Sequence, residues 1–260
     1  MDVAGLFAGT PAEVLTAGLA FARVSALFAA APVFRGRNLP SLVKGGLALL
    51  IVLLLLPGLV PLALPTDIVS LLLLLVREVG LGLLLGTLVQ LLFHAVQIAG
   101  QLADTEMGFQ MAAVLDPMSG QQVPLVGNFL GMLSLLFYFS VNGHILLLRA
   151  LGESFRIVPL GGLTFSFTPG LIVKSFTGMF ALAVQMALPL IGVSLAVSLI
   201  FGLMAKAVPQ MNVFIVGMPV KVIVLSLLLV IILPTFMYFF EHSLGAVFLR
   251  LADWLSAGIG

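Results

Sequence analysis

The chain has no cysteine among its 260 residues and very little charge. The absence of cysteine excludes disulfide bonds, thiolate metal sites and thiol nucleophiles. Only 8% of the residues are charged, and eleven Lys and Arg against ten Asp and Glu leave a formal charge of +1. Such a balance creates no strong electrostatic field, so the sequence excludes the binding of nucleic acid.

Motifs for catalysis are also missing. The three histidines are scattered, and no H-E-x-x-H, G-x-S-x-G or glycine-rich phosphate loop occurs. We therefore expect no metal and no cofactor. His144 follows Asn142 and Gly143, and this pattern predicts a local bend or a packing site.

Apolar residues, in contrast, make up 62% of the chain, which predicts an integral membrane protein. No basic residue precedes Arg23, whereas a cleaved signal peptide begins with a basic region, so we expect the first apolar run to be retained. A membrane-spanning helix needs about 20 mostly apolar residues. About six such regions occur. They are 15–34, 42–64, 68–100, 125–148, 172–205 and 214–251.

Proline is expected to kink or break several of these regions, because it lacks an N–H group and its ring clashes with the preceding turn. The prolines in question are Pro57, Pro61, Pro189, Pro219 and Pro234. Several regions are also longer than a simple span. The basic cluster at 35–44 predicts a cytoplasmic loop, but the remaining charges fit this orientation weakly. The sequence therefore argues against a plain up-and-down bundle.

Small residues recur at helical spacing. The sets are Gly82 and Gly86, Gly127 and Gly131, and Ser194, Ser198 and Gly202. Such residues let two helix backbones approach closely in a membrane. Packing within the chain and packing between subunits both remain open, and the first is favoured.

Arg77 and Glu78 lie inside the third apolar region, where ionisable groups are costly and need a partner. Adjacent residues of a helix do not face each other, so each needs a partner elsewhere. A structural pairing is favoured over a proton relay, because no ladder of further acids follows.

A polar stretch from Gly108 to Pro124 separates the third and fourth apolar regions. Its methionines are flexible and polarisable, and its prolines and glycines prevent a continuous helix. Irregular backbone at membrane depth is tolerated only inside protein or beside an aqueous cavity. The stretch is therefore either an exposed connection or a movable plug. A second glycine- and proline-rich segment, 161–170, predicts a boundary between two halves.

Three stretches carry a resemblance to a known family. They are "FARVSALFAAAPVFRGRNLPSLVKGGLALL" (21–50), "GFQMAAVLDPMSGQQVPLVGNFLGMLSLLFYFSVNGHILLLRALGESFRIVPLG" (108–161) and "AKAVPQMNVFIVGMPVKV" (205–222). In this order they resemble the FliR family of flagellar biosynthesis proteins, which includes the SctT proteins of type III secretion export gates. The resemblance covers nearly the whole chain.

The resemblance implies an all-α integral membrane protein of kinked helices and helical hairpins. A FliP-like half, 1–160, would include a plug loop at 106–124. A connector, 161–170, and a FliQ-like hairpin half, 171–260, would follow.

The resemblance also implies a function. The chain would not be an enzyme but a core subunit of the flagellar type III protein export gate in the bacterial inner membrane, at the flagellar basal body, with much of the complex on the periplasmic side. It would assemble with FliP, FliQ and FlhB, and unfolded rod, hook and filament proteins would pass through the gate.

The resemblance assigns roles to two groups of residues. The plug would consist of Phe109, Gln110, Met111, Asp116, Pro117, Met118, Ser119, Gly120 and Gln121. A cytoplasmic hairpin turn would include Lys206, Gln210, Asn212 and Lys221. Two alternatives remain. One is the virulence injectisome counterpart of the same family, and the other is a secondary transporter of small molecules, supported only by Pro189, Pro219 and Glu78.

Overall fold

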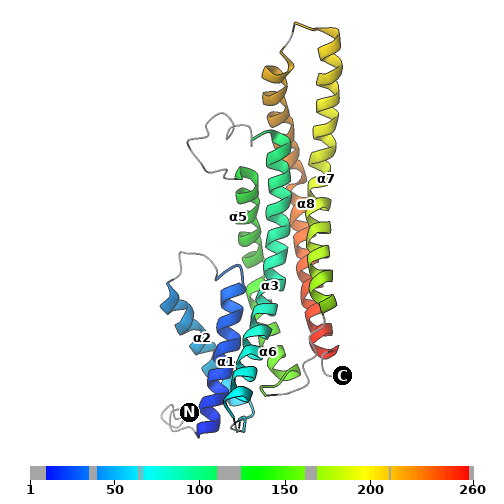
Figure 1. Ribbon diagram of the computed structural model, residues 1–260. Coiled ribbons are helices and arrows are strands. Elements are labelled where there is room, and N and C mark those ends of the chain that lie inside the picture. Colours follow the sequence, from blue (N-terminus) through cyan, green and yellow to red (C-terminus); the bar gives the residue numbers. More distant parts are fainter. Residues whose placement is uncertain are drawn as a thin grey trace. The chain divides into compact units, whose positions relative to one another are not determined.

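The computed structural model describes residues 10–34, 40–63, 65, 67–109, 124–161, 169–210 and 212–257. Within these ranges all regular structure is helical, and Figure 1 shows the helices in chain order. They are α1 (Pro11–Ala30), α2 (Ser41–Leu55), the short 3-10 helix η1 (Leu56–Gly58), α3 (Ile68–Met107), α5 (Leu125–Ser140), α6 (Gly143–Ile157), α7 (Pro169–Ala207) and α8 (Val213–Ala257). The predicted all-α fold class is confirmed.

The described helices also have the lengths that a membrane protein needs. Five of them are long and apolar enough to cross a membrane, and the number rises to six if α5 and α6 form one bent span. α3 has 40 residues. At about 1.5 Å per residue it is about 60 Å long, roughly twice the hydrocarbon thickness of a bilayer. α7 and α8, with 39 and 45 residues, also exceed a simple span, as the sequence indicates.

The prolines do not break the long helices. Pro57 lies in η1, just after the end of α2. Pro189 lies inside α7, and Pro219 and Pro234 lie inside α8, yet both helices continue through these positions. A proline removes only one backbone donor, and the other hydrogen bonds of a long apolar helix remain. The sequence allows either a kink or a break at these three prolines, and the structure excludes a break.

The α-helix of the second apolar region ends at Leu55, and the fourth region, 125–148, is interrupted in its middle. α5 ends at Ser140, and Asn142 adopts a left-handed backbone conformation with a φ of 56° before α6 begins at Gly143. Asparagine tolerates this conformation better than most residues. The bend predicted before His144 is confirmed.

The chain forms two compact units. The first comprises Met1–Leu91, Asn142–Val173 and Leu244–Gly260, and the second comprises Leu92–Val141 and Lys174–Ser243. Each unit therefore combines segments from both halves of the sequence. The division into halves at 161–170 rests on the family resemblance and stays a prediction.

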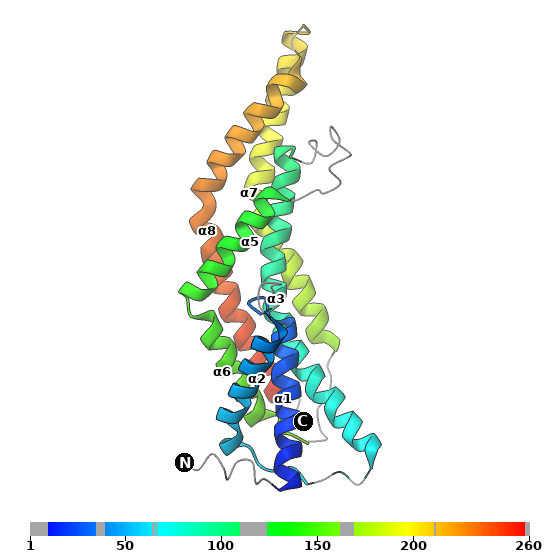
Figure 2. The same cartoon turned by 90° about the vertical axis from the view of Figure 1, so that its left-hand side faces the viewer.

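In the first unit, α1 packs against α2 and against the first part of α3, and Figures 1 and 2 show α2 beside α1. Glycines allow the approach of α3. A Cβ atom added at Gly86 would stand 2.6 Å from Ala30 Cβ and 2.7 Å from the Leu27 carbonyl oxygen. Gly82 is enclosed by Arg23 and Ala26 in the same way. This pair of glycines packs within the chain.

In the second unit, the last part of α3 packs against α5. A Cβ atom added at Gly100 would stand 2.7 Å from the backbone nitrogen of Gly127, so the two helices meet at these glycines. An aromatic cluster lies nearby in the same unit: the ring of Phe93 lies edge-on to those of Tyr138 and Phe240. Gly202, in contrast, has no atom near its missing side chain.

Candidate functional site

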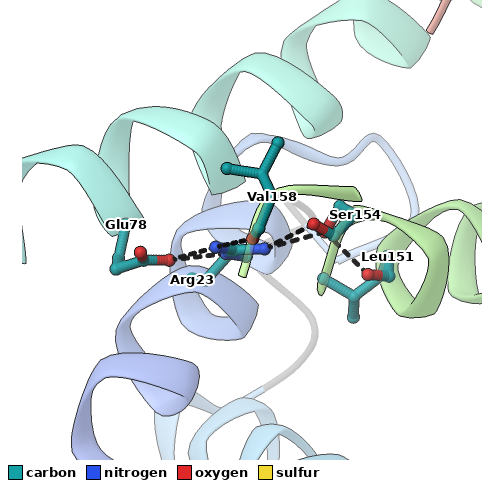
Figure 3. A network of polar contacts seen from close by, with 5 residues as sticks. All are labelled: Arg23, Glu78, Leu151, Ser154 and Val158. Atoms are coloured by element: carbon teal, nitrogen blue, oxygen red, sulfur yellow. Dashed lines mark hydrogen bonds and ion pairs between the residues drawn. The ribbon is translucent and has the colours of Figure 1, made fainter. Parts of the chain in front are cut away.

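Two charged side chains of the first unit are completely withdrawn from solvent. Arg23 on α1 and Glu78 on α3 are each 0% exposed, and Arg23 Nε and Nη2 both lie 2.6 Å from Glu78 Oε2. Figure 3 shows the guanidinium between this carboxylate and the end of α6. Charges persist inside a protein when they are paired and hydrogen-bonded. The structure thus supplies Glu78 with the partner that its position requires.

Arg23 also satisfies the end of α6. Its Nη1 group donates to the carbonyl oxygen and the Oγ of Ser154 at 3.0 and 3.2 Å, and Nη2 donates to the Val158 carbonyl oxygen at 3.0 Å. The last carbonyl groups of a helix lack donors within the helix and carry partial negative charge. The Phe155 ring lies 4.2 Å from the guanidinium carbon, in a cation–π contact. One side chain therefore joins α1, α3 and α6.

Arg77 is placed differently from its neighbour Glu78. The side chain is only part-buried, and its Nε and Nη1 atoms are enclosed without a hydrogen-bond partner. Of the two charges predicted to be buried, the structure buries Glu78 completely and leaves Arg77 part-exposed.

In the second unit, Asp104 joins the two ends of the polar stretch. Its carboxylate accepts hydrogen bonds from the backbone N–H groups of Val126 and Gly127, at 2.9 and 3.1 Å. Its backbone carbonyl accepts a hydrogen bond from the Phe109 N–H at 3.1 Å. The N–H groups at a helix start have no partner within the helix and favour a carboxylate. One buried residue of α3 therefore binds the chain on both sides of residues 110–123.

Glu106 forms a second polar junction in this unit. Its Oε2 atom accepts a hydrogen bond from the Ser194 hydroxyl on α7 and lies 3.4 Å from Lys221 Nζ on α8. The Glu106 and Lys221 side chains are 27% and 24% exposed, so water screens the pair only in part. The end of α3 is thus tied to α7 and α8.

The predicted plug loop begins later than the sequence indicates. α3 continues to Met107, and Gly108, with a φ of 81°, ends it in the left-handed conformation that glycine adopts without strain. Glu106 and Met107 are therefore helical. Phe109 follows in a turn. The other predicted plug residues lie outside the described residues: Gln110, Met111, Asp116, Pro117, Met118, Ser119, Gly120 and Gln121.

The predicted hairpin turn corresponds to the short connection between α7 and α8. Lys206 lies in the last turn of α7 and Gln210 in the connection, and both are exposed. The Asn212 Oδ1 atom accepts a hydrogen bond from the Ile215 N–H at 3.3 Å and so caps α8. Lys221 lies within α8, where it contacts Glu106.

Sequence reasoning missed the roles of Arg23, Asp104 and Glu106. A signal existed for Arg23, because a single arginine inside an apolar run marks a buried pair or a polar path. Asp104 and Glu106 lie beyond the apolar region 68–100, and the apolar pattern gives no signal that α3 continues to Met107. Within the described residues, no group of three or more metal-ligating side chains occurs.

Comparison with known proteins covers nearly the whole chain. The family described as "Bacterial export proteins, family 1" matches residues 14–247. A flagellar biosynthetic protein FliR of Bacillus subtilis is 38% identical over 82% of this chain and 84% of its own length. The FliR proteins of Escherichia coli and Pectobacterium carotovorum are each 33% identical, over 90% and 91% of both chains.

These matches include the buried and capping residues described above, which all fall between residues 14 and 247. They place the chain among export components rather than enzymes. The chain belongs to family 1 of the bacterial export proteins, together with these flagellar biosynthetic FliR proteins.

Proposed function

We propose that the chain is a core subunit of the flagellar type III protein export gate in the bacterial inner membrane. The observation that carries this proposal is the family match over residues 14–247, with flagellar relatives aligned over most of their length. The chain would assemble with FliP and FliQ, with FlhB at the entrance, and line a channel for unfolded rod, hook and filament proteins.

Co-purification tests the assembly. The full chain, co-expressed with FliP and FliQ of the same organism, is expected to be recovered as a stable hetero-oligomer that depends on all three. Recovery of the chain alone, in a form that the other two neither bind nor stabilise, would overturn the proposal.

The relatives favour a flagellar over an injectisome gate, because those compared are named for flagellar biosynthesis. Neighbouring genes for rod and basal-body proteins are expected, and needle and effector genes would reverse this assignment. The transporter alternative has lost its support. Pro189 and Pro219 lie in continuous helices, and Glu78 is bonded to Arg23.

Within the gate, we propose that residues 109–121 close the channel at rest. The motivation is their composition together with the family resemblance. Asp104 supports the idea from the described side, because its bonds to Phe109, Val126 and Gly127 keep the two ends of this stretch together. Because its two ends are held together, the segment can be displaced by substrate and then return to the same position.

Conductance measures closure. A deletion of residues 108–120 in the assembled gate is expected to leak ions in planar bilayers. Replacement of 110–120 by an equally long Gly-Ser sequence separates loss of the seal from a change in loop length, and it should leak as well. Unchanged conductance in both variants, with assembly verified, would contradict the plug role and leave the assembly proposal intact.

A further inference from the structure

Arg77 is a part-buried cation without a hydrogen-bonded anion among the described residues. Two of its nitrogen atoms, Nε and Nη1, are enclosed and have no acceptor. The neighbouring Glu78 is bound to Arg23, and adjacent helix residues point in different directions. Arg23 and Arg77 carry two positive charges, and Glu78 supplies one negative charge, so one positive charge remains uncompensated.

The other acidic side chains that the structure describes in the first unit are bonded elsewhere. Glu13 accepts a hydrogen bond from the Thr10 N–H, Asp67 binds Ser70, and Glu153 pairs with Arg156. A buried charge without a partner is costly. None of the acidic side chains described in this unit is hydrogen-bonded to Arg77, so an anion for it would come from beyond the described residues.

The surroundings of Arg77 indicate where this anion approaches. On the same helix, Leu73 and Val76 are 66% and 68% exposed. Gly80, one turn after Arg77, has no atom within 4 Å of its missing side chain. The exposed part of the arginine therefore lies beside an open apolar surface.

A protein carboxylate fits this place better than a lipid phosphate. Arg77 is nine residues after Ile68, which corresponds to about 14 Å along the helix. Where α3 enters a membrane at its first turn, that depth exceeds a headgroup layer of about 5–8 Å.

We propose that Arg77 is a docking residue that receives an Asp or Glu carboxylate from a partner subunit. The inference rests on the proposed assembly with other gate subunits. It has a distinctive consequence: loss of Arg77 should keep or raise the stability of the isolated chain but lower the stability of the complex. Removal of an unpaired cation relieves a cost in the isolated chain, whereas removal of one member of an intersubunit pair weakens the complex.

The test compares Arg77→Met and Arg77→Gln with the parent chain, expressed alone and with the partner subunits, in a neutral detergent without added lipid. The variants alone are expected to keep or raise the midpoint temperature of thermal unfolding. Recovery of the intact complex is expected to fall about tenfold or more. Arg156→Gln, at an exposed arginine paired with Glu153, serves as the matched control and should change neither measurement.

Three outcomes overturn the docking role. One is full recovery of the complex with both variants. Another is a large loss of stability in the isolated variants, which would give Arg77 a role inside its own fold. The third is a recovery defect seen only when anionic phospholipid is added, which would make lipid phosphate the anion. If the parent chain itself does not co-purify, the proposed assembly fails first, and the docking role fails with it.

Discussion

Glu106 on α3 and Lys221 on α8 form an ion pair, with 3.4 Å between Oε2 and Nζ, although 115 positions separate them in the sequence. Ser194 of α7 donates its hydroxyl to the same carboxylate oxygen. Two residues earlier, Asp104 caps α5. The last turn of α3 therefore bonds to three other helices of the second unit, immediately before the segment to which we assign closure.

Separation of this ion pair is expected to loosen the end of α3. Glu106→Gln and Lys221→Gln should each lower the free energy of unfolding in mixed micelles, with a coupling of about 1 kcal/mol in the double-mutant cycle. The exchanged pair, Glu106→Lys with Lys221→Glu, should recover part of the loss, because it restores opposite charges. Additive single effects without recovery would show that the contact contributes nothing.

Loss of Arg23 is expected to be among the most damaging changes in the first unit. Arg23→Gln removes the guanidinium bonds to the Glu78 carboxylate and to the Val158 carbonyl oxygen, whereas the Ser154 carbonyl oxygen keeps the bond from the Val158 N–H. We expect a loss of about 3–5 kcal/mol in the free energy of unfolding. Glu78→Gln should cost less, because the amide oxygen still accepts a hydrogen bond from the guanidinium. Detergent-titration unfolding measures both, and equal stability of all three chains would contradict the buried network.

A further variant separates charge pairing from packing. The double substitution Arg23→Met with Glu78→Leu fills the same space without charge, and it should be less damaging than Arg23→Gln alone. It still lacks the bonds that Arg23 donates to the Ser154 and Val158 carbonyl oxygens, of which only Ser154 keeps a backbone donor. A double variant as unstable as the single one would therefore assign most of the effect to the cap of α6.

Removal of the Asp104 carboxylate is expected to free the start of α5. Asp104→Ala should cost about 1–2 kcal/mol, and amide hydrogen exchange in a peptide covering 124–130 should become faster. Asp104→Asn keeps one acceptor oxygen, so its stability and its exchange rate should lie between those of the parent chain and Asp104→Ala. Glu153→Gln, at a surface position, is the control. Unchanged exchange in Asp104→Ala would show that the cap does not hold this helix.

Sequence patterns were sufficient for the helices and insufficient for their pairing. Runs of about 20 apolar residues fix where helices form, because a bilayer allows few other structures. The Asn142–Gly143 pair indicated the interruption between α5 and α6 correctly. Pro57 lies where α2 ends, but Pro189, Pro219 and Pro234 lie inside continuous helices, because a proline alone does not determine whether the neighbouring turns support a helix around it.

The polar contacts show the same limit. Glu78 was recognised as a charge that needs a partner, yet Arg23 is 55 positions away. Nothing local connects these residues, because their meeting depends on the close packing of α1 and α3. Asp104 and Glu106 follow the apolar region 68–100, so the apolar pattern does not place them in a helix. Their helical position became clear only from the contacts with α5, α7 and α8.

The glycines of α3 give the last prediction, since they permit that packing of α1. A methyl group at Gly86 would stand 2.6 Å from Ala30 Cβ, closer than two carbon atoms can approach, so the helices must separate. We expect Gly86→Ala to cost about 1–3 kcal/mol in the free energy of unfolding. Gly18→Ala, at an exposed α1 position without neighbours, should instead add about 0.5–1 kcal/mol through helix propensity. Equal changes in the free energy of unfolding at the two positions would mean that helix propensity alone determines the effect. The close contact between Gly86 and Ala30 would then not limit the packing of α1 and α3.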